Sequence, residues 1–310
     1  MNHPIDSRAD ARSGLLQIVL AAILWGTVGV ATKYLFTISS ANALSIGFFR
    51  LALATPVLLA TCWYLLGARA FRIPAGDMRY MVLIGVAMAF YQVSYFAAIA
   101  RVGVAIAVLI TLCTAPVLVS LLSALLLRER LSRAVLAALV CALAGTVMLV
   151  WVGPATGAVA QQTLTGIVLA LGSACGYSLI ALFSRTLAGR YHPLQPITVG
   201  FAAGALILLP FALAAGLVVT YPPAGWAVLL HLGLIPTALA YVLFLAGIRH
   251  TTATVATIAT LIEPLTSTTL AWLLFGERLG PLGLLGALLL LGAIGLLYAD
   301  SARRTQAPPE

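Results

Sequence analysis

The chain has 310 residues, of which 62% are apolar and 8% are charged, and its formal net charge is +9. Soluble domains carry roughly 25% charged residues, so this composition excludes a water-soluble globule and also a disordered chain. The apolar residues run in long blocks and do not alternate, which is not the pattern of a transmembrane β-barrel. We therefore predict an all-α integral membrane protein.

Ten apolar segments follow one another along the chain, separated by short polar stretches. Each is close to the roughly 20 residues that a helix needs to cross a bilayer. The first segment is too long for the apolar region of a signal peptide, and we interpret it as a retained helix. The expected spans lie at residues 14–34, 43–66, 80–100, 103–127, 132–152, 163–184, 194–218, 224–248, 252–275 and 281–299.

Basic side chains are distributed unevenly between the two sides that ten spans define. With the N-terminus inside, thirteen Lys and Arg residues fall on the cytoplasmic side and three on the other, while Arg50 lies within a span. The positive-inside rule then predicts a multi-pass protein of a bacterial inner membrane, with both termini in the cytoplasm. It also accounts for the net charge without nucleic acid, because no soluble basic surface is expected.

The chain resembles itself at an offset of 148 residues. Between residues 96–131 and 244–279, 12 of 36 positions are identical without a gap, including Pro116 with Pro264 and Glu129 with Glu277. Five spans per repeat is an odd number, so the second repeat would be inverted relative to the first. Inverted repeats are typical of transporters that bind substrate near the bilayer midplane and work by alternating access. We predict two repeats, at 14–152 and 163–299.

In both halves a mid-helix proline is followed 13 residues later by Glu-Arg-Leu. Together with Trp-Gly at 25–26 and Phe-Phe-Arg-Leu at 48–51, these motifs resemble the EamA repeat of the drug/metabolite transporter superfamily over nearly the whole chain. The resemblance implies an exporter of amino acids or other small metabolites, and the chain looks most like the aromatic amino-acid exporters. The small multidrug relatives carry an essential Glu in their first helix, whereas the first span here has no acid.

Several aromatic residues are candidates for a substrate cavity. Tyr91 and Tyr95 are four residues apart and share one helix face, which fits either a cavity wall or an aromatic belt at the membrane interface. Trp25 and Tyr177 lie at mid-depth in the paired first and sixth spans, where a belt is not expected. Tyr241 in the eighth span is a further candidate.

Three ionisable residues within the spans have more than one interpretation each. Glu263, beside Pro264, is either a proton-coupling or amine-binding carboxylate or a buried structural group, and the hypothesis we prefer is that it tunes transport without binding substrate. Arg50 either attracts a substrate carboxylate, pairs with a helix end, or extends outward to the interface. His231 either packs through a hydrogen bond or contacts substrate or a proton.

Other sequence features narrow the class of function. The cysteines have no metal-ligand spacing, and no phosphate-binding loop is present, so we expect no cofactor, no metal and transport driven by gradients. The residues supply no convergent catalytic set, which makes a membrane enzyme a remote alternative.

The Gly200–Gly204 motif fits helix packing within a monomer better than dimerisation. Expected partners are a small-molecule substrate, lipid and, if transport is coupled, protons. Nucleosides and toxic drugs are the alternative substrates.

Overall fold

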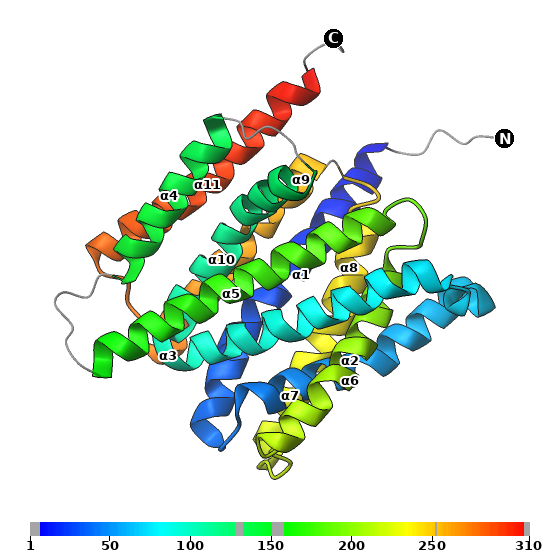
Figure 1. Ribbon diagram of the computed structural model, residues 1–310, viewed down its shortest axis with the longest axis horizontal. Coiled ribbons are helices and arrows are strands. Elements are labelled where there is room, and N and C mark those ends of the chain that lie inside the picture. The colour runs from blue at the N-terminus through cyan, green and yellow to red at the C-terminus, as the bar shows by residue number, and fades with distance from the viewer. Residues whose placement is uncertain (1–6, 128–132, 151–157, 252, 307–310) are drawn as a thin grey trace.

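The computed structural model describes residues 7–127, 133–150, 158–251 and 253–306, and these form helices and their connections with no strand among them. Figure 1 shows long helices packed side by side, with the start of α1 and the end of α11 on the same side of the bundle. We call that side the terminal end and the opposite side the distal end.

The first half of the chain contributes four long helices. Asn42 caps the second of them, because its side chain accepts a hydrogen bond from the Ser45 amide at 2.8 Å. A 3₁₀ turn at Gly67–Phe71 then leads into the third helix. The four are α1 (Ser7–Ile38), α2 (Ala43–Leu66), α3 (Ala75–Leu127) and α4 (Arg133–Val150).

The second half contains more interruptions. A π-helical segment at Leu234–Leu239 separates α7 from α8, and a break at Leu261 separates α9 from α10. The helices are α5 (Ala158–Leu187), α6 (Leu194–Ala214), α7 (Pro223–Gly233), α8 (Ala240–Gly247), α9 (Ala253–Thr260), α10 (Ile262–Phe275) and α11 (Pro281–Gln306).

Among the described residues, seven helical stretches are long and apolar enough to cross a membrane. The longest, Ala75–Ser123, contains Gly103 at φ 81°, where the two expected spans 80–100 and 103–127 meet as two arms of α3. Two shorter apolar helices lie at Arg133–Leu149 and Pro281–Leu297. The chain is thus an all-helical, multi-pass membrane protein, and the count of ten spans stays a prediction.

The helices pair across the two halves of the chain. α3 packs most extensively against α5, α4 packs against α11, and α1 packs against α8 and α10 (Figure 1). Large apolar side chains such as Leu206, Val140 and Leu265 point outward and are about two-thirds exposed. A surface of this kind is unusual in water but is the expected contact with lipid tails.

The Gly200–Gly204 motif packs inside the chain. A Cβ atom added to Gly85 of α3 would lie 2.7 Å from the Gly200 carbonyl oxygen of α6. Only glycine permits so close an approach of two helix backbones. The motif therefore joins α6 to α3 within one chain.

Candidate functional site

A cavity of about 480 Å³ lies inside the bundle. This volume falls in the range of small-molecule sites in proteins. Its lining residues come from both halves of the chain. Residues that line it include Trp25, Val28, Arg50, Met88, Tyr91, Gln92, Tyr95, Cys113, Pro116, Ser120, Tyr177, Phe201, Thr237, Tyr241, Phe244, Ala256, Thr260, Glu263, Pro264, Ile294 and Leu297.

Aromatic rings form two walls of this cavity. On α3, the rings of Tyr91 and Tyr95 stack with centroids 6.0 Å apart, and Tyr177 of α5 meets Tyr91 edge-on at 5.6 Å. On the other side, Trp25 of α1 contacts Tyr241 at 5.3 Å. Rings in these arrangements attract one another and offer flat apolar surface to a ligand.

Most of the side chains singled out from the sequence meet at this cavity. Trp25, Arg50, Tyr91, Tyr95, Tyr177, Tyr241, Glu263, Pro116 and Pro264 all line it. His231 does not line it. Its Nε2 lies 3.0 Å from the Thr27 hydroxyl, beside a separate, mostly apolar pocket between α1, α7 and α10. The structure thus places His231 in the packing of α7 against α1.

Two glycines bring cavity helices close together. A Cβ atom on Gly26 of α1 would lie 2.6 Å from the Thr266 Cβ and 3.0 Å from the Glu263 carbonyl oxygen of α10. A Cβ atom on Gly176 of α5 would lie 3.0 Å from the Tyr91 Cα of α3. Gly26 therefore sets how closely α1 approaches α10, and Gly176 sets how closely α5 approaches α3.

Arg50 is a buried cation at the edge of the cavity, with only 5% of its surface exposed. Its Nε donates to the Thr237 hydroxyl at 2.8 Å, and its Nη1 donates to the Gln92 amide oxygen at 3.2 Å. The guanidinium carbon lies 5.9 Å from the centre of the Phe96 ring. Among the described residues, ion pairs within 4.0 Å join only Lys33 with Glu277 and Arg190 with Asp77, so Arg50 has no carboxylate partner there.

Sequence reasoning missed Gln92 and Thr237. Both are about 1% exposed and line the cavity, and both accept a hydrogen bond from Arg50. The sequence feature that could have identified them is a polar side chain inside an apolar span, because a buried polar group needs a hydrogen-bond partner. Periodicity alone could not show that the partner was the same arginine.

At the distal end, Glu277 connects three parts of the chain. One of its carboxylate oxygens accepts from Lys33 Nζ at 2.6 Å and from the Val104 amide at 2.9 Å, and the other accepts from the Ala105 amide at 2.8 Å. These amides begin the second arm of α3, just after Gly103, so Glu277 caps that arm. We call Lys33, Glu277 and these two amides the distal latch. The corresponding Glu129 lies outside the described residues.

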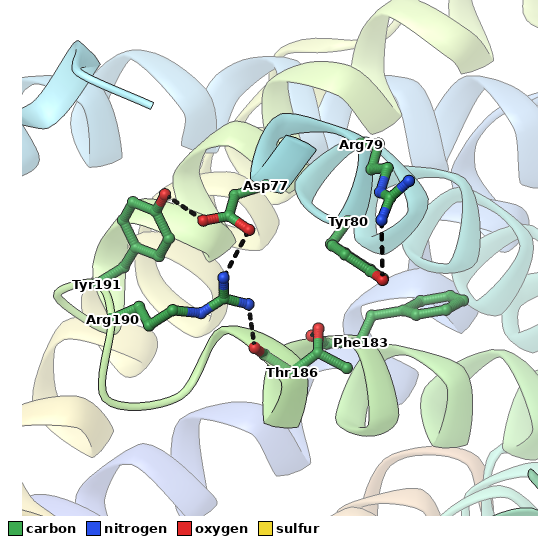
Figure 2. Close-up of polar contacts among 7 residues, drawn as sticks. All are labelled: Asp77, Arg79, Tyr80, Phe183, Thr186, Arg190 and Tyr191. Carbon is green, nitrogen blue, oxygen red and sulfur yellow. Dashed lines mark hydrogen bonds and ion pairs between the residues drawn. The ribbon is translucent and has the colours of Figure 1, made fainter. Parts of the chain in front are cut away.

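At the terminal end, a polar network joins α3 to the loop between α5 and α6 (Figure 2). Asp77 pairs with Arg190 at 2.8 Å and accepts from the Tyr191 hydroxyl at 2.7 Å, and this hydrogen bond raises the pKa of Tyr191. The next residue, His192, contacts Arg249 at the end of α8. Burial and the neighbouring Arg249 lower the pKa of His192.

The comparisons with known proteins identify the family. The family model of the EamA-like transporter family matches residues 12–151 and again residues 164–299. The chain therefore belongs to the EamA-like transporter family and is a membrane transporter.

Similar proteins support this assignment. An uncharacterized transporter of Bacillus subtilis, YwfM, is 30% identical over 95% of this chain and 96% of its own length. The pseudopaline exporter CntI of Pseudomonas aeruginosa is 27% identical over 91% and 94% of the two chains. A solved crystal structure with 22% identity covers 96% of this chain and 99% of its own, with a TM-score of 0.64, which shows a shared fold.

Proposed function

We propose that this transporter exports amino acids, aromatic ones in particular, or related small metabolites across the bacterial inner membrane. It works by secondary-active or facilitated transport. The observation that carries the proposal is Arg50, a buried cation with no carboxylate partner among the described residues, at the edge of a cavity walled by aromatic rings. A substrate carboxylate would supply the missing anion, and an aromatic side chain would stack on the rings.

Alternating access between two inverted five-helix repeats, ten spans in all, is the mechanism we propose. Two observations support it. The family model matches the chain twice, at residues 12–151 and 164–299. The cavity is lined by residues of both halves of the chain, such as Tyr91 and Tyr241, as expected for a binding site between two repeats. The distribution of basic residues supports a cytoplasmic terminal end.

Uptake into proteoliposomes tests the substrate. The panel contains phenylalanine, tryptophan, leucine, phenethylamine, a nucleoside and a cationic dye, each measured with and without a pH gradient. We expect phenylalanine or tryptophan to be taken up fastest. Arg50→Gln should reduce this uptake at least about tenfold, because a charge-assisted contact is lost. The matched control is Arg101→Gln, since Arg101 is exposed, does not line the cavity, and donates through its guanidinium to a carbonyl of its own helix. Uptake of the nucleoside or dye without any amino acid would contradict the proposal.

Glu263 is the proposed site at which transport is tuned, without direct contact to substrate. It lines the cavity on α10, directly before Pro264, which cannot donate a backbone hydrogen bond. If protons are coupled through this carboxylate, Glu263→Gln removes the dependence of the uptake rate on an imposed pH gradient. Uptake rates equal to those of the wild type at every pH would exclude coupling through Glu263.

A further inference from the structure

The two acceptors of Arg50 are both uncharged. Thr237 offers a hydroxyl oxygen to Nε and Gln92 an amide oxygen to Nη1. No described residue accepts a hydrogen bond from Nη2. A buried guanidinium is usually paired with a carboxylate, because burying an unpaired charge is unfavourable. Here the side chain is held on two sides by uncharged acceptors, and Glu263, which lines the same cavity, forms no ion pair with it within 4.0 Å.

The π-helical segment explains why Thr237 can act as an acceptor. The Thr237 hydroxyl donates its single proton to the Leu232 carbonyl oxygen at 2.6 Å, across five residues, as the register of a π-helix allows. Its oxygen lone pairs are thereby left for Arg50 Nε. The interruption between α7 and α8 thus fixes the direction of the hydroxyl, and π-helical turns are frequent at functional sites.

Gln92 fixes the guanidinium from a different helix. It lies on α3 between Tyr91 and Tyr95 and lines the same cavity as those rings. A glutamate at this position would have nearly the same shape and would bring a negative charge to Arg50. The Gln92 amide carries no negative charge, so it orients the guanidinium of Arg50 without neutralising it.

We infer that Gln92 and Thr237 are specificity-determining positioning residues, which hold Arg50 oriented through uncharged acceptors and without an ion pair, so that the site selects solutes with a carboxylate. This inference rests on the proposed function and deepens it. Discrimination between an amino acid and the corresponding amine then comes from Arg50, whereas the aromatic walls accept the ring of either. The carboxylate of the substrate would accept hydrogen bonds from the part of the Arg50 guanidinium that donates to no described residue.

The test compares phenylalanine with phenethylamine, which lacks the carboxylate, in proteoliposomes containing Gln92→Glu. The introduced carboxylate neutralises Arg50 from inside the protein. We expect KM for phenylalanine to rise at least about tenfold relative to KM for phenethylamine, with a smaller change in kcat. The matched control is Gln161→Glu, the same chemical change at an exposed position of α5 outside the cavity, and it should leave the ratio unchanged.

A second pair of variants, at Thr237, tests the inference independently if Gln92→Glu does not fold. Thr237→Val keeps the shape of the side chain but removes the acceptor, and Thr237→Ser restores it. We expect the valine variant to lose preference for phenylalanine over phenethylamine and the serine variant to recover it. If both Gln92→Glu and Thr237→Val kept the wild-type preference for phenylalanine over phenethylamine, this inference would be overturned, while the proposed function would still stand. A wild-type protein that transports other panel solutes but no carboxylate would overturn the proposed function as well.

Discussion

Lys33 Nζ lies 2.6 Å from Glu277 Oε1, which ties the end of α1 to the segment that follows α10. The same carboxylate accepts the first free amides of the second arm of α3. The ion pair is therefore one part of a helix cap. Because Lys33 and Glu277 are 244 residues apart, the contact joins the two halves of the chain at the distal end.

The first prediction concerns the two members of this ion pair. Glu277→Gln should lower the free energy of unfolding by about 2 kcal/mol, because two amides and a lysine lose a charged acceptor. Lys33→Met should cost less, about 0.5–1 kcal/mol, since the Lys33 side chain is 28% exposed and partly screened. Unfolding in mixed detergent micelles measures both. Equal losses would mean that the ion pair, and not the cap, is the stabilising part.

Gly103 should not tolerate a side chain. Its φ of 81° is unfavourable for other residues, and an added Cβ would lie 2.8 Å from Glu277 Oε1. We expect Gly103→Ala to destabilise the protein by about 1–3 kcal/mol. Gly292→Ala is the control, because Gly292 lies within α11 with no atom within 4 Å of the added Cβ. A thermal melt in detergent should show a loss for the first variant and none for the second.

Tyr91→Ala should change substrate preference more than expression. Tyr91 contacts both Tyr95 and Tyr177, so its removal opens one wall of the cavity. We expect KM for phenylalanine to rise about tenfold while KM for leucine changes by less than about threefold. Tyr64→Ala is the matched control, since Tyr64 is 87% exposed near the end of α2. An unchanged ratio of phenylalanine to leucine uptake would count against a wall role for Tyr91.

The loop between α5 and α6 should give stability a dependence on pH. Burial and Arg249 lower the pKa of His192 in the folded protein below its ordinary value near 6.5. The unfolded chain then binds more protons in this range, so stability is full above about pH 6.5 and falls as pH decreases toward the folded pKa. His192→Gln should weaken this decrease, measured as the melting temperature between pH 5 and 8. A decrease of the same size in His192→Gln would assign it to other groups.

Much of the architecture could be predicted from residue order alone. Spans such as 43–66 and 194–218 agree closely with α2 and α6, because twenty apolar residues in a row have few alternatives to a membrane helix. Short-range polar signals were informative as well, since the Tyr91 and Tyr95 spacing placed both rings on one face.

The partners of the buried polar residues could not be predicted in this way. Arg50 meets Thr237 across 187 residues, and Glu277 caps an arm that begins 173 residues earlier. His231, equally promising in the sequence, packs against Thr27 away from the main cavity. Hydrophobicity and helical periodicity act over a few turns of one helix, so they fix which segments cross the membrane. The pairing of side chains on different helices depends on how the helices rotate and pack, and that is a property of the folded chain as a whole.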